Sequence, residues 1–258
     1  GRDFFEFGYK YPGIIRIDAD TFETEYFTDF VEIFYADKKW REDDNRYFFV
    51  DGVALNDGNL YIPTGLDHHL FSLCIEKARY EFINVRTNIK KILRISGYKD
   101  EIWMTDVDGS TGRITILNRM NDSVEEIILS SKGIWYAPFF WNGYAYLLPM
   151  SDEAACYSVN TETKTAEVFS RLDELFFESP EPEKGTGRRN SNVQAYEQNG
   201  SIVTFIRRPD LTWFTYDFET NELTSAVYEI TDEEYIKNLE KDYYERIFTG
   251  ACRNNMII

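Results

Sequence analysis

The chain has 258 residues, of which 43% are hydrophobic and 17% aromatic, enough apolar material for one large folded domain. Its formal net charge of −17 disfavours nucleic acid and anionic membrane surfaces as partners, because binding polyphosphate requires a concentrated positive field. No apolar run approaches the roughly 18 residues of a membrane-spanning helix, and no targeting segment is recognisable. We therefore expect no membrane insertion, and both a cytoplasmic and a cell-surface location stay open.

The first 29 residues predict strands joined by turns. The stretch IDADTFETEYF places Asp18 and Thr21 three residues apart between alternating apolar runs, which is typical of a hairpin turn. The same pattern occurs twice more, at Asn160 with Thr163 and at Asp217 with Thr220. These three turns are of one kind and indicate a repeat.

Turns of a second kind lie between them, in the stretches VALNDGNLYIP, RISGYKDEIWMT, APFFWNGYAYLLP and AYEQNGSIVTF. In each, a turn residue is followed three positions later by an apolar residue: Gly58 by Tyr61, Asp100 by Trp103, Gly143 by Tyr146, and Gly200 by Val203. The turn residues are 42, 43 and 57 positions apart, so the repeat carries one long insertion. Asn-Gly and Asp-Gly supply the positive φ angles that tight hairpins need.

The two kinds of turn keep a fixed offset. Asn160 lies 17 residues after Gly143, and the last repeat has the same offset, so each repeat is predicted to contain four strands, a to d. Counting 17 back from Asp18 reaches Gly1, so we expect Gly1 in an a–b turn and residues 3 to 7 paired with residues 13 to 18. The a strand of the first repeat is then missing or supplied from elsewhere. One candidate is the apolar end of the chain, residues 254 to 258, which would close a ring and remove an unpaired edge.

Four-stranded antiparallel units of about 40 to 45 residues, with aromatic residues at alternate positions, resemble the repeats of the β-propeller superfamily. The resemblance implies an all-β fold built from such blades. We assign five blades, with six blades or a truncated larger ring as alternatives, at residues 1–29, 47–85, 91–129, 133–170 and 190–230. Thr231 and Glu234 form a capping box that predicts one C-terminal helix over about residues 232 to 247. The chain has neither the Trp-Asp ending of WD repeats nor the Gly-Gly pair of kelch repeats, so the resemblance carries no functional residues with it.

The stretch IWMTDVDGSTGRITIL, residues 102 to 117, contains the short segment that looks most like a catalytic motif. It resembles the Asp-x-Asp-Gly-Thr signature of haloacid dehalogenase-like phosphatases, which would make Asp106 the nucleophile and Asp108 the acid/base. With Ser110, the same oxygens have the alternating spacing of a calcium loop. A serine interrupts the phosphatase signature, the flanks favour an antiparallel hairpin, and the glycines are misplaced for an EF-type loop. We interpret the segment as a b–c turn and predict no catalytic residue, metal or cofactor.

Strand parity predicts where a binding site would lie. In an antiparallel blade the a–b and c–d turns emerge on one side, here named the turn face, and the b–c and between-blade connections emerge on the other, the loop face. Both long insertions, residues 29–47 and 171–191, are between-blade connections. Long loops in compact domains are more often functional than accidental, so we expect any partner on the loop face.

The candidate ligand-binding residues lie in loop-face segments and form three groups. Aromatic side chains suited to stacking on a sugar ring are Tyr9, Tyr11 and Trp40. Turn residues with metal, acid/base or purely structural readings are Asp67, His68, His69, Asp108, Asp152 and Asp210. Basic residues suited to a carboxylate or phosphate, or to pairing with nearby acids, are Arg188, Arg189, Arg207 and Arg208.

Two functions fit these features. The first is a non-catalytic recognition module whose partner is a glycan, a peptide or a protein. The second is a glycan-processing enzyme, since some five-bladed propellers are glycosidases with two carboxylates about 5 to 10 Å apart across the channel. The predicted a strands offer Asp51 and Glu197, both at strand ends, which favours the recognition module.

Other distinctive residues are expected to be structural. Cys74, Cys156 and Cys252 are widely separated and lack metal-ligand spacing, so three free thiols are predicted. The tryptophans expected in the core are Trp103, Trp135, Trp141 and Trp213.

Overall fold

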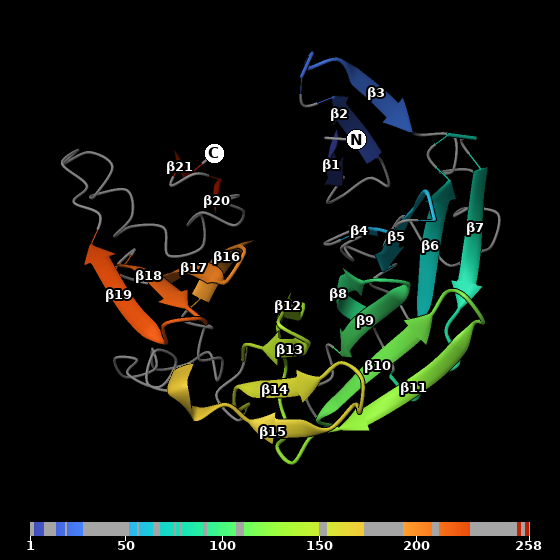
Figure 1. Ribbon diagram of the computed structural model, residues 1–258. Helices are drawn as coiled ribbons and strands as arrows, with labels where there is room; N and C mark the ends of the chain where they lie inside the picture. The colour runs from blue at the N-terminus through green and yellow to red at the C-terminus, as the bar shows by residue number, and fades with distance from the viewer. Residues whose placement is uncertain are drawn as a thin grey trace, which may run out of the picture.

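The computed structural model describes residues 3–7, 14–18, 20–27, 52–55, 57–63, 68–74, 76–77, 79–89, 92–106, 111–149, 154–172, 193–207, 212–227, 252–253 and 256–257. Over these ranges the protein is all-β, apart from one 3-10 turn, η1 (Ser170–Leu172). Figure 1 shows the sheets set around a common axis, with the first strand of each sheet nearest the axis and the last strand outermost.

Every sheet is antiparallel, and its strands follow one another in chain order. Sheet 1 contains β1 (Asp3–Phe7), β2 (Ile14–Asp18) and β3 (Thr24–Phe27). Sheet 2 contains β4 (Val53–Ala54), β5 (Asn59–Pro63), β6 (His69–Cys74) and β7 (Arg79–Asn84). Sheet 3 contains β8 (Ile92–Tyr98), β9 (Glu101–Asp106), β10 (Arg113–Asn118) and β11 (Ser123–Ile128). Sheet 4 contains β12 (Phe139–Trp141), β13 (Tyr144–Leu147), β14 (Tyr157–Asn160) and β15 (Ala166–Val168). Sheet 5 contains β16 (Val193–Asn199), β17 (Ile202–Arg207), β18 (Thr212–Asp217) and β19 (Glu222–Val227).

The two ends of the chain differ in how they meet the sequence predictions. The predicted pairing of the first repeat is confirmed, since β1 pairs with β2 from Asp3 opposite Asp18 to Phe7 opposite Ile14. At the other end, β21 (Met256–Ile257) pairs with β20 (Cys252–Arg253) in a separate two-stranded sheet and not with β1. The predicted closing strand is therefore wrong in its partner, because a local hairpin closes a far shorter loop. Gly1 and the predicted helix at 232–247 lie outside the described residues.

The c–d turns form as the Asp/Asn and Thr spacing predicts. Asp18 Oδ1 accepts hydrogen bonds from the backbone N–H groups of Asp20 and Thr21 at 2.9 and 2.8 Å, and these bonds hold the pKa of Asp18 below its usual value. Asn160 Oδ1 accepts the corresponding bonds from Glu162 and Thr163, both at 2.9 Å. Each turn then places one residue at positive φ, namely Phe22, Asp122, Lys164 or Asn221. We call this the left-handed turn position.

The core lies between neighbouring sheets, because successive side chains of a strand point to opposite faces. Along β9, Ile102 and Met104 are fully buried against sheet 2, whereas Trp103 is fully buried against sheet 4. Of the four tryptophans expected in the core, Trp103 and Trp135 are confirmed at 0% and 1% exposure; the other two are partly buried. The thiol of Cys156 is buried and that of Cys74 partly buried, and both are free as predicted.

Sheet 5 departs from the repeat by one residue. In sheets 3 and 4 the first turn residue after strand c donates its N–H to Asp100 and Gly143, but in sheet 5 the acceptor is Ser201, one position beyond the expected Gly200. Relative to the register predicted from the sequence, this shift exchanges the two faces of β17. Val203 therefore packs in the cluster shared with sheet 4. Thr204 therefore holds the register position of Tyr61, and the match between Gly200 and Val203 was wrong by one residue.

Candidate functional site

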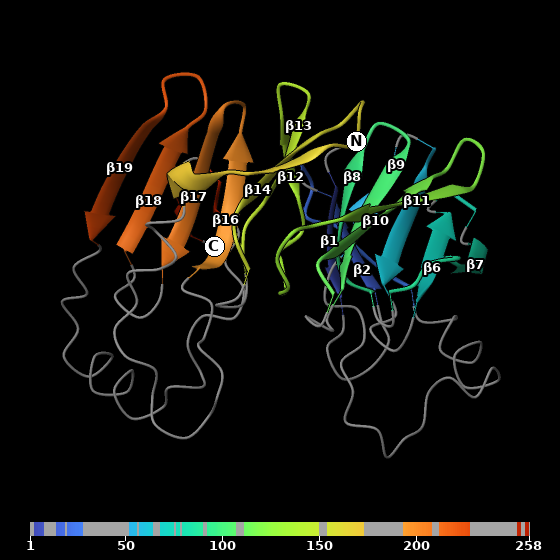
Figure 2. The same ribbon diagram turned by 90° about the horizontal axis from the view of Figure 1, so that it is seen from below.

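The two faces of the molecule are distinguished by the strand directions. Figure 2 shows the a–b and c–d turns together along one edge. The positive-φ residues Gly58, Gly143 and Gly200 belong to a–b turns. The b strands end, the c strands begin and the d strands end at the opposite edge, which is the predicted loop face. Phe27, the last residue of β3, therefore directs the chain into the first long insertion from that edge. After Val168, the second insertion begins beside sheet 5, where Arg171 donates a hydrogen bond to Asn221 of the c–d turn.

Among the predicted site residues, the structure describes His68 and His69 and the backbone of Arg207, which ends β17 at the loop face. The others lie outside the described residues: Tyr9, Tyr11, Trp40, Asp67, Asp108, Asp152, Arg188, Arg189, Arg208 and Asp210.

The two histidines lie against one another. Their rings stack with centroids 4.7 Å apart and planes inclined by 25°, and both residues are partly buried. Adjacent side chains within a strand point to opposite faces, but His68 precedes β6 and only His69 belongs to the strand, so the pleat does not separate the two rings. The His68 carbonyl also accepts a 3.3 Å hydrogen bond from the Val85 N–H. Within the described ranges no group of three or more His, Cys, Asp or Glu residues could hold a metal ion.

The phosphatase-like stretch connects two antiparallel neighbours. β9 ends at Asp106 and β10 begins at Arg113, with Thr105 directly opposite Ile114. This excludes the parallel strand feeding a helix that a phosphatase of that kind requires. Asp106 is 4% exposed at the strand end. At the other end of the stretch, a Cβ on Gly112 would lie 1.9 Å from the Ser131 carbonyl oxygen, so a glycine is required there by close packing.

Beside this stretch, hydrogen bonds to Tyr157 hold the connection between sheets 3 and 4. The Tyr157 hydroxyl lies 2.9 Å from Ser130 Oγ, accepts the Ser131 N–H at 2.8 Å, and lies 2.9 Å from Ser131 Oγ. Trp135 Nε1 donates to the Ala155 carbonyl at 2.8 Å. These polar groups bond one another, so this part of the loop face is a fixed support for the segments around it.

Glu126 holds the connection between sheets 2 and 3 in a similar way. Its carboxylate accepts the Asn88 backbone N–H at 2.7 Å and the Thr87 hydroxyl at 2.9 Å, and pairs with Arg113. Burial alone raises the pKa of Glu126, but the hydrogen bonds from Asn88 and Thr87 and the charge of Arg113 outweigh it and lower the pKa.

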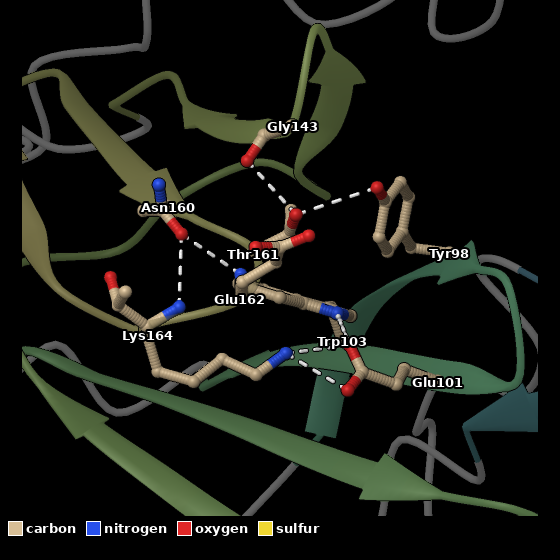
Figure 3. A network of polar contacts seen from close by, with 9 residues as sticks. Tyr98, Glu101, Trp103, Gly143, Asn160, Thr161, Glu162 and Lys164 are labelled. Atoms are coloured by element: carbon tan, nitrogen blue, oxygen red, sulfur yellow. Dashed lines mark hydrogen bonds and ion pairs between the residues drawn. The ribbon is translucent and has the colours of Figure 1, made fainter.

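On the turn face, an aromatic residue of strand b is covered by a side chain from the next sheet. Figure 3 shows this at sheets 3 and 4: Lys164 Nζ lies 2.9 and 2.7 Å from the two oxygens of Glu101 and 4.7 Å from the Trp103 ring centre. Trp103 Nε1 donates to Glu101 at 2.9 Å. Nearby, the Thr161 hydroxyl donates to the Gly143 carbonyl at 2.9 Å.

Equivalent caps close the two flanking interfaces. Arg119, from the c–d turn of sheet 3, lies 5.3 Å from the Tyr61 ring centre and donates to the Tyr61 hydroxyl at 3.0 Å. Phe218, from the c–d turn of sheet 5, lies with its ring 4.3 Å from that of Tyr146. The repeat spacing identified Tyr61, Trp103 and Tyr146 but missed their caps, and the sole sequence signal for a cap was its place in a c–d turn.

Comparisons with known proteins give similarity in structure alone. No family model matches the chain, and no curated protein matches it in sequence. A streptogramin B lyase matches with a TM-score of 0.58 at 12% identity, over 90% of this chain and 66% of that one. Virginiamycin B lyase from Staphylococcus aureus matches with a TM-score of 0.56 at 12% identity, over 89% and 70%. The computationally designed Ika8 protein matches with a TM-score of 0.48 at 11% identity, over 86% and 60%.

The chain thus spans between 60% and 70% of the length of these solved structures. No helix in the described ranges has the length and apolar character needed to cross a membrane. The two lyases are β-propellers, and likeness at 12% identity concerns the fold. The four-stranded antiparallel sheets around one axis are accordingly those of a β-propeller.

Proposed function

We propose that the protein is a non-catalytic recognition module that binds a glycan, a peptide or a protein through its loop face. One observation supports this more than any other, the difference between the two faces. The turn face is closed by tight turns whose polar groups bond within the turn, as Asn160 does, or to the neighbouring sheet, as Lys164 does. At the loop face β3 ends at Phe27, where the sequence continues into the first long insertion, and the proposal places both insertions on this face.

The proposal also specifies the number of blades and one helix. Sheets 1 to 5 form a five-bladed ring, and residues 232–247 form a helix outside it. A rigid ring suits recognition, because loops held by fixed supports such as the Tyr157 and Glu126 networks lose less conformational entropy on binding. Three described residues belong to the proposed surface: His68, His69 and the end of β17 at Arg207.

A binding screen of the intact chain tests the proposal. The chain is applied to glycan and peptide arrays and used in pull-down, and the hit is then measured by titration. Trp40→Ala, or Arg207→Ala combined with Arg208→Ala, should weaken binding by more than about 1 kcal/mol, the scale of an anchor residue. The turn-face variants Thr163→Ala and Thr220→Ala are the matched controls. Loss of binding in these controls, with the loop-face variants unaffected, would show that the face is wrongly assigned.

The alternative is an enzyme, either a glycan-processing one or, as the names of the structural neighbours suggest, a lyase. A glycosidase would need a carboxylate pair across the channel, for which the sequence offers Asp51 and Glu197. Incubating the chain with virginiamycin B and with a glycan library, followed by mass spectrometry, separates the two classes. Turnover without stable binding would reverse the proposal.

A further inference from the structure

Sheet 2 has a hollow on the side that faces sheet 3, near the turn face. Its cavity measures about 300 Å³, the lower end of the range for small-molecule sites. The cavity lies over two cross-strand rows: Asn59, Cys74 and Arg79 form one, and Tyr61, Ser72 and Glu81 form the other. The hollow is part of neither the turn face nor the loop face.

The hollow is lined by a serine, the residue type also found at the same register position of sheet 4, whereas sheet 3 has a larger residue there. Ser72 lines the cavity and is 2% exposed. In sheet 3 the same register position, opposite Trp103, is held by Ile116, which packs in the core between sheets 3 and 4. A serine at this position removes apolar volume and leaves a hydroxyl in its place.

The two carboxylates on the cavity wall already have partners. Asp57 Oδ1 accepts the Asn59 N–H at 3.0 Å, and its other oxygen accepts the Tyr61 hydroxyl. Burial first, and then the bond to Asp57, raise the pKa of Tyr61, so the phenol stays a donor. Glu81 lies 3.8 Å from the guanidinium of Arg119. Both carboxylates therefore have partners on the interior side of the cavity.

The two cations on the wall are free of such partners. Lys77 and Arg79 both line the cavity, and neither makes an ion pair or side-chain hydrogen bond with any residue that the structure describes. The wall carries as many carboxylates as cations, but both carboxylates have partners, so among the described residues Lys77 and Arg79 are its unpaired charges. A guanidinium and an ammonium above a hydroxyl and an amide make a set of donors that suits oxyanions.

We propose that this cavity binds a small anion through carboxylate or phosphate oxygens, with Lys77 and Arg79 as the charged contacts and Ser72 at its floor. The site is separate from the loop face and acts whether or not the loop face binds a partner. Cys74 also lines the cavity, so its thiol provides a direct reporter of occupancy.

The experiment uses the intact chain and a neutral alkylating reagent, with modification of Cys74 followed by peptide mass spectrometry. Inorganic phosphate and succinate are compared with chloride at equal ionic strength. Phosphate protection alone would identify a phosphate site, and succinate protection alone a carboxylate site. Equal alkylation rates in all three solutions would overturn the proposal.

Variants separate this site from general charge effects. Arg79→Gln, at an exposed position, should weaken binding of the protecting anion by about tenfold, the loss expected for one charge-assisted hydrogen bond. Lys132→Gln removes an exposed cation elsewhere and should change nothing. Ser72→Ile restores the residue type of the next sheet and should abolish protection without removing charge. If Arg79→Gln binds the anion as tightly as the original chain, the site is wrong even should Ser72→Ile fail to fold.

Discussion

At the scale of single residues, Lys164 connects two sheets. It lies 63 positions from Glu101 in the chain, and the two side chains are 12% and 20% exposed. Its left-handed backbone, with φ of 57°, belongs to a c–d turn of sheet 4. The sequence could not predict this contact, because it depends on how neighbouring sheets pack and not on any local pattern.

Replacing Lys164 should therefore weaken the interface between sheets 3 and 4. Lys164→Met keeps the aliphatic stem over Trp103 but removes the charge, and we expect a loss of about 1 to 2 kcal/mol in the free energy of unfolding from the ion pair and the ring contact. Urea denaturation measures it. In the Lys164→Met background, Glu101→Gln should then lower the free energy of unfolding by less than it does in the original chain. Fully additive losses would mean that the pair does not interact.

Glu126 makes the stability of the folded chain depend on pH in the acid range. Its pKa lies below the ordinary value of 4.5 in the folded chain, so its contribution is present above the unfolded pKa and is lost as the pH falls through the folded one. Glu126→Gln should lower stability at pH 7 and flatten the fall in stability below about pH 4.5. Urea titrations between neutral and acid pH measure this. Glu125→Gln, at the exposed neighbour, is the control, and an unchanged acid slope in Glu126→Gln would contradict the assignment.

At the scale of elements, the hairpin turns were the most predictable part of the fold. Asn-Gly and Asp-x-x-Thr act through local backbone geometry, which a single sequence reveals. The register of sheet 5 was not predictable to one residue, because Ser201 and not Gly200 takes the equivalent backbone bond. Most residues of the predicted site lie outside the described ranges, so the site stays a prediction.

The c–d turns are open to a direct test at Asn160. Asn160→Ala removes the oxygen that accepts two backbone N–H groups, and should cost about 1 kcal/mol. Asn160→Asp keeps that oxygen and should lose much less, since Asp18 performs the same role in sheet 1. Equal losses in both variants, measured by thermal unfolding, would show that the acceptor oxygen is not what stabilises the turn.

At the scale of the whole molecule, stability comes from the interfaces between sheets. Clusters of buried residues join sheets 2 and 3, sheets 3 and 4, and sheets 4 and 5. The sequence predicted the four-stranded unit and its repetition, because both follow from alternation and spacing. Which residue types meet across each interface could not be predicted, since repeats of different sequence pair there.

The net charge of −17 gives a prediction at the same scale. Self-repulsion opposes the compact state, so raising sodium chloride from low to physiological ionic strength should raise the melting temperature by about 2 to 4 °C. Local ion pairs such as Lys164 with Glu101 act in the opposite sense, but in the part of the chain that the structure describes they are few beside the excess of acids. Calorimetry at a series of salt concentrations measures the net effect. A melting temperature that falls with salt would show that local pairs dominate.

The caps also record the order of the sheets. Arg119 suits a phenol, Lys164 suits an indole beside a carboxylate, and Phe218 suits a bare ring. A chain in which two sheets exchanged places would bring a cation to a site built for a ring, or leave a carboxylate without its ammonium. A change of the strand residue therefore calls for a matching change in the turn of the following repeat. In this way each repeat comes to fit one predecessor, and the arrangement around the axis is fixed by side chains as well as by the chain that joins them.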